Sequence, residues 1–460
     1  MSSPDEPTSV GPTGRQLLGD RNIRWFLVAA TAGSVGAFLQ AAALGKQLYD
    51  ITDSELALGL LGLVEFLPAL LLLPLTGSAA DRFDRRRVAA IGLSGEVITS
   101  IAFCVYAAGD PTSAVPIFVI AALFGVSRAF VAPSLRSVPP MIVPHGGLPR
   151  LVAFYSASWQ FGLVAGPAAS GFLYDVDPTI PYVVSAICFA VAAGGVAVLR
   201  VRHPQQRTPA NERPSLHHAL EGLRFVAGRP VLLGAIALDL FAVLFGGAVA
   251  LLPAIAEDRL GVGNVGYGWL RAAPGIGAVI ITAILAVSPV RRRIGPTLFV
   301  VVAIFGVATI VFGMTRDYLV AFIALVVLAG ADAISVFIRG TLVPLATPDR
   351  MRGRVMAVEN VFIGASNELG AFESGAAATW LGVGPAVTIG GFATLAVVGV
   401  WWFLFPSLRT IDRFDDVHED TRVFDSRPAD ASPATDLTED PNEPCATSSE
   451  SSRNSSPPAT

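Results

Sequence analysis

The sequence carries little charge for its length. Asp, Glu, Lys and Arg make up 15% of the 460 residues, whereas a typical soluble domain has about 25%. Much of the surface is therefore expected to face something other than water. The formal net charge is only −4, so the strongly basic surface by which proteins bind nucleic acid is missing and no nucleic-acid partner is expected.

Cysteine and histidine are also scarce. The three cysteines, Cys104, Cys188 and Cys445, show neither a disulfide framework nor metal-ligand spacing. The five histidines all fall in polar connections. The sequence shows no pairing of a nucleophile with a base and no phosphate-binding loop. We therefore expect no enzyme activity, no metal and no cofactor.

Long apolar runs dominate the chain instead. The mean hydropathy is +0.60, and a helix needs about 20 mainly apolar residues to cross the hydrocarbon core of a bilayer. The first run is too long for the core of a signal peptide, so we expect it to be retained. The fold class is therefore an all-α membrane protein with twelve transmembrane helices. The predicted spans are Trp25–Leu48, Leu56–Leu75, Val88–Ala108, Pro116–Leu135, Leu151–Leu173, Tyr182–Leu199, Pro230–Ile255, Val265–Ala286, Pro296–Met314, Tyr318–Ile338, Val355–Leu381 and Pro385–Phe405.

The arginines predict the orientation of these spans. They cluster after the second, eighth and tenth spans, at Arg82–Arg87, Arg291–Arg293 and Arg350–Arg354, while the connections after the first, third and fifth spans carry none. Cytoplasmic loops of membrane proteins collect Lys and Arg. We therefore expect a multi-pass protein of the cell (inner or plasma) membrane with both termini in the cytoplasm.

A polar segment divides the spans into two sets of six. Its second half, Leu216–Phe225, is predicted to form a short amphipathic helix at the membrane surface. The end of the chain is rich in Asp, Glu, Ser, Pro and Thr, a composition that favours disorder. The predicted organisation is a polar cytoplasmic N-terminus (residues 1–23), an N-terminal six-helix bundle (24–201), a cytoplasmic linker (202–229), a C-terminal six-helix bundle (230–406) and a disordered acidic cytoplasmic tail (407–460).

The connection after the second span carries a motif made of Gly77, Asp81, Arg82, Arg85 and Arg86. It resembles the signature loop of the major facilitator superfamily, with Asp84 where that family usually has glycine. An aspartate here can accept hydrogen bonds at a helix N-terminus of the other bundle, and the arginines can bind lipid headgroups. We predict a cytoplasmic gating loop; an ordinary loop that obeys the positive-inside rule is the alternative.

The fifth span contains Gly162, Gly166, Pro167 and Gly171, which resemble the exporter-type motif of the same superfamily in part. Generic packing of small residues is the alternative. Three further segments, Tyr49–Thr52, Glu65–Pro68 and Thr347–Val355, resemble the branch of the enterobactin exporter and the macrolide-efflux transporters. The resemblance implies two pseudo-symmetric six-helix bundles facing each other across a central cavity, in a protein that works as a monomer. It also implies that helices 3, 6, 9 and 12 face lipid.

Polar and charged side chains within the spans are the candidates for binding substrate or protons, because such residues are costly in a bilayer and usually face a cavity or a partner. For Asp239 and Arg128, both near the midplane, a structural ion pair is the alternative. Glu96 lies in the third span, which the resemblance places against lipid, and we expect its side chain to turn inward toward a cation. Lys46 and Arg271 are expected to reach for the outer interface. The candidates are Asp239, Arg128, Glu65, Gln160, Asp332, Asn360, Asn367 and Glu368.

We predict a secondary transporter that exports an amphiphilic small molecule, such as a drug or siderophore-like compound, in exchange for protons. The proton motive force would supply the energy, and a buried carboxylate would carry the proton. A uniporter or importer on the same fold stays open as an alternative. A membrane receptor or regulator that binds a ligand without moving it is the alternative from another class.

Overall fold

The computed structural model describes residues 12–72, 75–76, 83–202 and 216–417, and over these residues the chain is helical with no strand. The first half contributes six long helices. They are α2 (Arg21–Thr52), α3 (Glu55–Leu71), α5 (Arg85–Ala107), α6 (Val115–Arg136), α8 (Leu148–Val176) and α9 (Ile180–Ala197). Two short helices, α1 (Gly14–Gly19) and α7 (Pro139–Ile142), lie between or before them.

The second half repeats this pattern after a short helix, α10 (Leu216–Ala227). Its first span is irregular, because α11 (Pro230–Phe245) is followed by a 3-10 turn at Gly247–Leu251, by α12 (Leu252–Ala254) and by a π-helix, η3 (Ile255–Arg259). The remaining spans are α13 (Asn264–Val287), α14 (Ile294–Met314), α15 (Tyr318–Leu345), α16 (Asp349–Leu381) and α17 (Val383–Leu404), and α18 (Pro406–Arg409) follows them.

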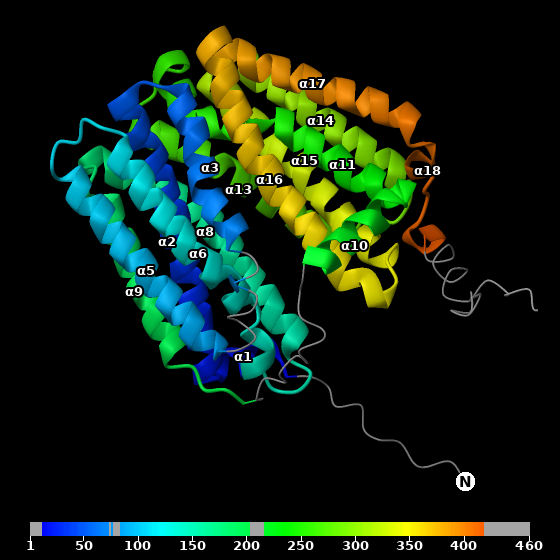
Figure 1. Cartoon of the computed structure of the whole chain (residues 1–460), viewed down its shortest axis with the longest axis horizontal. Coiled ribbons are helices and arrows are strands. Elements are labelled where there is room, and N and C mark those ends of the chain that lie inside the picture. The colour runs from blue at the N-terminus through cyan, green and yellow to red at the C-terminus, as the bar shows by residue number, and fades with distance from the viewer. Residues whose placement is uncertain (1–11, 73–74, 77–82, 203–215, 418–460) are drawn as a thin grey trace, which may run out of the picture.

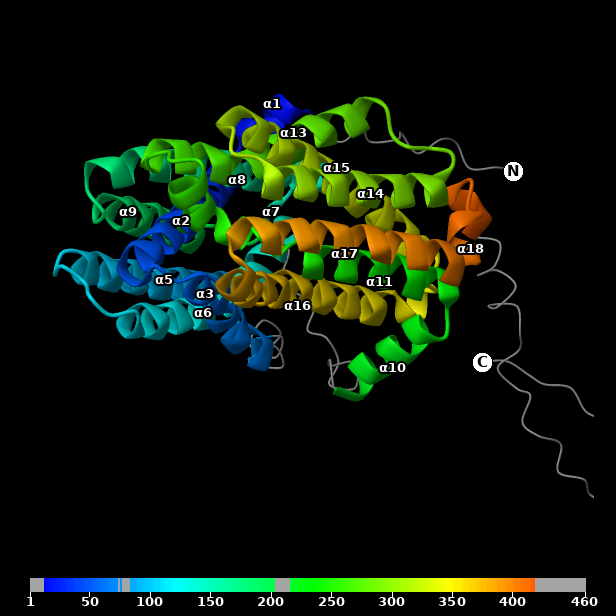
Figure 2. The same cartoon turned by 90° about the horizontal axis from the view of Figure 1, so that it is seen from above.

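The helices form two groups that meet at one end and diverge at the other (Figure 1). The helices from α2 to α9 make one bundle, and those from α11 to α17 make the other. The bundles touch mainly through two helix pairs, α3 with α16 and α8 with α13, with smaller contacts of α3 with the 3-10 turn and of α2 with α12. Viewed from above, the two groups lie side by side (Figure 2). We call the end where the bundles meet the closed end; α1 and α10 lie at the other, diverging end (Figure 1).

Within the described residues, nine helical segments are long and apolar enough to cross a membrane by length and hydropathy. The three long helices outside this set are α3, α8 and α16. All three take part in the contact between the bundles. α3 has 17 residues, and the structure does not describe residues 73–74, which follow it.

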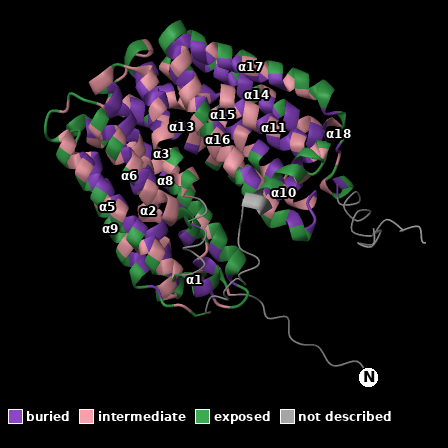
Figure 3. Cartoon of the chain, in the orientation of Figure 1, coloured by how far each residue is buried: buried purple, intermediate pink, exposed green. Residues whose placement is uncertain are grey.

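Exposed and buried residues alternate around the helices of both bundles (Figure 3). Many of the exposed residues are large and apolar, and they form rows along individual helices. Such rows lie on α5, α9, α14 and α17, which are the third, sixth, ninth and twelfth spans, and also on α6, α13 and α15. Large exposed apolar surfaces of this kind mark contact with a partner or with lipid. On α5 the row consists of Ile91, Ile98, Ile101 and Val105.

Two predicted boundaries are wrong in a way that matters for the site. The tenth span continues past Ile338 to Leu345, and the eleventh begins at Asp349 instead of Val355. The predicted boundaries placed Arg339 just beyond the end of the tenth span and Glu359 about one turn from the start of the eleventh. In the structure both residues lie well inside their helices.

The start of the predicted disordered tail is also ordered. Residues 407–417 pack against the second bundle, with Leu408, Ile411 and Val417 buried and Phe414 beside them. These apolar side chains recur every three residues, a spacing that the composition argument overlooked. The structure does not describe residues 418–460. The predicted helix in the linker is confirmed as α10, Leu216–Ala227.

Candidate functional site

Glycines set the distance between the two bundles. Gly59 of α3 packs against α16 so closely that a Cβ atom there would lie 2.8 Å from the carbonyl oxygen of Ala371. Gly171 of α8 lies against Gly268 of α13, where an added Cβ would lie 2.8 Å from the Cα of Gly268. Because real Cβ atoms do not approach this closely, the contact between the bundles requires small residues at these points.

The predicted motif in the fifth span serves two different contacts. Gly162 and Gly166 lie against α2 of the same bundle, near Ser34 and Phe38, whereas Gly171 faces the other bundle. Pro167 is buried within α8, and its carbonyl oxygen lies beside Gly268. The motif therefore fixes α8 between its own bundle and the opposite one.

Polar side chains join the bundles at the closed end. The ammonium group of Lys46 on α2 lies 2.9 Å from a carboxylate oxygen of Glu257, and the hydroxyl of Tyr49 donates to Asp258 at 2.5 Å. The hydroxyl of Tyr267 on α13 donates to the carbonyl of Ala42 on α2 at 2.9 Å. We call Lys46, Tyr49, Glu257 and Asp258 the closed-end latch.

The position of Lys46 in the latch differs from the prediction, in which this side chain reaches for the outer membrane interface. Lys46 is 9% exposed and forms ion pairs with both Asp50 and Glu257. The π-helix η3 supplies both acidic partners of the latch. Its irregular turn, and the contact that it makes with α2 across the molecule, have no signal in the linear sequence.

A cluster of opposite charges lies between the bundles, and it brings together three predicted candidates. The carboxylate of Glu368 on α16 lies against Gly62 of α3, one turn from Glu65. Arg128 on α6 and Arg271 on α13 are close enough to interact electrostatically with both of these glutamates. The expectation that Arg271 reaches for the outer interface is wrong, because its guanidinium donates to the carbonyl of Val249 at 3.1 Å and interacts with Glu65 of the first bundle and Glu368 of its own bundle.

Glu96 extends this central cluster within the first bundle. It is only 3% exposed although it lies on α5, whose opposite face carries the exposed apolar row. Arg128 is the cation that interacts with it electrostatically. The expected inward turn of Glu96 is thus what the structure shows.

A second cluster is buried inside the other bundle. The guanidinium of Arg339 on α15 lies 2.8 Å from the carboxylate of Asp239 on α11 and 3.5 Å from that of Glu359 on α16. The exposed fractions of the three side chains are 3%, 8% and 5%. Asp332, two turns before Arg339 on α15, interacts electrostatically with Asp239 and Arg339.

This cluster corrects the predicted partner of Asp239. An ion pair between Asp239 and Arg128 was the structural alternative to a binding role, whereas the partner of Asp239 is Arg339; Glu359 was not among the candidates. One oxygen of Glu359 has no hydrogen-bond partner within the described residues. Such an atom is costly when buried, so the cluster has unused capacity to bind a proton.

The other three candidates do not join either cluster. Asn360 and Asn367 lie on exposed positions of α16, and their side-chain amides donate to the carbonyls of Met356 and Ile363 at 2.7 Å, one turn earlier. Gln160 is half-buried on α8. The structure therefore places these residues on helices that border the junction without contact to the charged groups.

Only part of the predicted gating loop is described. Gly77, Asp81 and Arg82 lie outside the described residues. Asp84 caps α5 by accepting from the backbone N–H of Arg86 at 3.0 Å, and the Arg86 guanidinium holds the pKa of Asp84 below its usual range. The backbone φ of Asp84 is −62°, which any residue adopts, so glycine is not required there.

These observations define a class: a membrane transporter built from two six-helix bundles of the major facilitator fold. The family described as "Transmembrane secretion effector" (MFS_3) matches residues 17–429, and the chain belongs to this family. The resemblance to the major facilitator superfamily is thereby confirmed. The chain is a multi-pass membrane protein.

Several similar proteins are named as efflux transporters or exporters. The multidrug efflux pump Tap of Mycolicibacterium fortuitum is 26% identical over 84% of this chain and 96% of its own length. The enterobactin exporter EntS of Escherichia coli O1:K1 is 25% identical over 61% of this chain and 66% of its length. The match to multidrug resistance protein 1 of Bacillus subtilis (strain 168), at 26% identity, covers 38% of this chain and spans under half, 45%, of that protein.

Solved structures share the fold at low sequence identity. The D-xylose-proton symporter superposes with a TM-score of 0.65 at 14% identity, covering 84% of this chain and 99% of that one. The nucleoside transporter NupG superposes with a TM-score of 0.63 at 11% identity over 84% and 99% of the two chains. These similarities establish the two-bundle architecture.

Proposed function

We propose that this protein is a secondary active transporter that exports an amphiphilic small molecule in exchange for protons. The observation that carries the proposal is the surplus of carboxylates in the buried cluster. Asp239, Asp332 and Glu359 surround one guanidinium, that of Arg339. Several negative charges cannot share a low-dielectric site with a single cation, so such a site binds protons.

The coupling follows from the position of this cluster. Asp239, Arg339 and Glu359 come from three helices of one bundle, α11, α15 and α16. Because α16 also packs against α3 of the other bundle, movement of the bundles changes the environment of the carboxylates. Protons would then be taken up in one conformation and released in the other, while substrate occupies the central cluster at Glu65, Arg128 and Glu368.

The orientation belongs to the same proposal. The connections rich in arginine lie at the diverging end, where α1 and α10 are found, so this end is assigned to the cytoplasm. The closed end with its latch then faces outside. In this state an exporter would load its substrate from the cytoplasm. The two bundles, 24–201 and 230–406, would rock as units in a monomer of the inner or plasma membrane, with the Asp81 loop closing the cytoplasmic side.

Relatives suggest the substrate class. The names of Tap and EntS specify multidrug efflux and enterobactin export. A drug-like or siderophore-like amphiphile would fit a site that combines charged groups with apolar helix faces. Import or uniport on the same fold would reverse or remove the dependence on the proton gradient.

Dye uptake into inverted membrane vesicles tests the proposal. We expect uptake driven by an acidic vesicle interior to fall at least about tenfold in Asp239→Asn, which loses a proton-binding carboxylate, and in Glu65→Gln, which loses a charge of the substrate cluster. Asp349→Asn is the matched control, since the side chain of Asp349 is 89% exposed. Unchanged gradient dependence in Asp239→Asn would remove the proposed proton site, and unchanged uptake in Glu65→Gln would remove the proposed substrate cluster. Uptake without a gradient would favour a uniporter.

A further inference from the structure

A pocket at the diverging end lies outside both charged clusters. It has a volume of about 610 Å³ and is bordered by α10, by the connection from α10 to α11 and by the first turns of α16. Its ionisable lining consists of four arginines (Arg224, Arg229, Arg350 and Arg354) and one glutamate (Glu221), which leaves a net charge of +3. The pocket is thus suited to an anion.

The walls of the pocket are fixed to the body of the protein. Gly222 of α10 packs against the backbone of Arg354, where an added Cβ would lie 2.9 Å from the carbonyl oxygen, and Val226 is buried in the core of the second bundle. Glu221 and Arg354 hold the two helices together through an ion pair of 2.6 Å. The arginines are therefore presented by a rigid frame.

The two acidic residues at or beside the pocket already form ion pairs, one with Arg354 and one with Arg352. Glu221 pairs with Arg354, and Asp349 pairs with Arg352 at 2.6 Å. Among the described residues, Arg224 and Arg350 have no carboxylate partner. An Arg fork binds phosphate oxygens through paired hydrogen bonds, and an unpaired fork beside a pocket is available for this.

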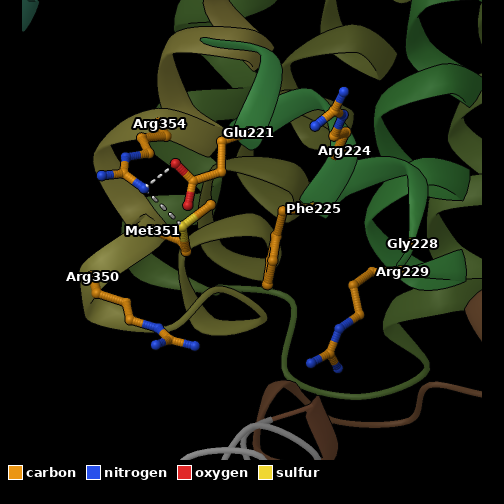
Figure 4. Close-up of a pocket in the computed structure, with 8 residues that line it drawn as sticks. All are labelled: Glu221, Arg224, Phe225, Gly228, Arg229, Arg350, Met351 and Arg354. Atoms are coloured by element: carbon orange, nitrogen blue, oxygen red, sulfur yellow. Dashed lines mark hydrogen bonds and ion pairs between the residues drawn. The ribbon is translucent and has the colours of Figure 1, made fainter. Parts of the chain in front are cut away.

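The arrangement of the side chains supports one oxyanion between two arginines. Figure 4 shows Arg350 and Arg229 on either side of Phe225, with their guanidinium ends on the same side of that residue, while Arg224 is turned away from them. The guanidinium of Arg229 lies over the ring of Phe225 at 5.5 Å, which fixes its orientation. The structure thus offers a clamp for a phosphate group with an aromatic wall.

The surroundings of the pocket specify the source of the phosphate. The outer face of α10 exposes Leu220 and Leu223 at 53% and 40%, next to Arg224. A helix that combines exposed leucines with arginine lies in the interface of a bilayer. α10 also precedes α11 directly, so it sits where a spanning helix begins. Lipid headgroups reach such a position.

We propose that this pocket binds the phosphate of an anionic phospholipid headgroup, with Arg229 and Arg350 as the clamp and Arg224 as the outer contact. The bound lipid would link α10 to α16. Because α16 also carries Glu359 and Glu368, lipid composition would act on the helix that connects the two charged clusters.

Native mass spectrometry of the full-length protein tests the site. The protein is released from nanodiscs of phosphatidylcholine with phosphatidylglycerol, and the retained lipid is counted. We expect phosphatidylglycerol retention to fall about tenfold in Arg350→Ala, since hydrogen bonds to a charged group contribute about one such factor. Arg350→Lys should retain an intermediate amount, because it keeps the charge and loses the fork.

Arg352→Ala is the matched control. It removes the same charge two residues away at a side chain that pairs with Asp349 and does not line the pocket. Equal retention in Arg350→Ala and Arg352→Ala would overturn the proposal. Displacement of the lipid by millimolar inorganic phosphate would assign the site to a free anion instead. Binding of lipid only after removal of residues 418–460 would assign it to the acidic tail, and would likewise overturn the proposal.

Discussion

At the residue scale, Arg339 is the cation of the buried cluster in the second bundle. It is 2% exposed, lies inside α15 and forms ion pairs with Asp239 and Glu359. A buried ion pair contributes little net stability when compared with apolar residues of the same shape. Removing one partner is different, because it leaves the other charges buried and unpaired.

We therefore predict that Arg339→Met destabilises the protein by about 3–5 kcal/mol. The quadruple variant that adds Asp239→Asn, Asp332→Asn and Glu359→Gln should recover most of this loss, since it removes every carboxylate of the cluster along with the cation. Denaturant unfolding in mixed micelles measures the effect. A single variant as stable as the parent protein would show that Arg339 does not neutralise these carboxylates.

At the scale of elements, α8 and α13 pack closely because the glycines at their contact have no side chain. Gly171 faces Gly268 across the junction. The same helix uses Gly162 and Gly166 toward α2, so its two faces bring together helices of different bundles. The partial exporter-like motif therefore has a packing role on both sides of α8.

Gly171→Val should cost about 1–3 kcal/mol, the usual range for overpacking a close contact. It should also reduce transport, because the closed end can no longer form at its present spacing. Gly194→Val on α9 is the control, since an added Cβ at Gly194 meets nothing within 4 Å. Thermal unfolding in detergent and vesicle uptake measure the two effects. Equal behaviour of the two variants would contradict the packing role.

At the scale of the whole molecule, the closed-end latch holds the two bundles together. Lys46 and Tyr49 belong to the first bundle, and Glu257 and Asp258 to the second. These contacts exist only while the closed end is closed. Their loss is expected to favour the opposite conformation, because it removes stabilisation from one state alone.

We predict that Lys46→Glu, which places a third acid beside Asp50 and Glu257, shifts the protein toward a state open at this end. Adding Glu257→Lys should restore the closed state. Electron-spin distances between labels at Asp110→Cys and Arg316→Cys, in a cysteine-free background, report this end directly. An unchanged distance distribution in the single variant would show that the latch does not set the equilibrium.

Sequence alone determined the twelve spans and their grouping into two sets of six, because crossing a bilayer imposes length and hydropathy on each segment independently. It also located Glu65, Arg128, Glu368 and Asp239. It missed Arg339 and Glu359 among the charged groups inside the spans. Tertiary structure alone decided the partners: Arg339 for Asp239, Arg271 for Glu65 and Glu368, and Glu257 for Lys46. Ion pairs join side chains that are far apart in the chain, and only the packing of the helices brings them within reach.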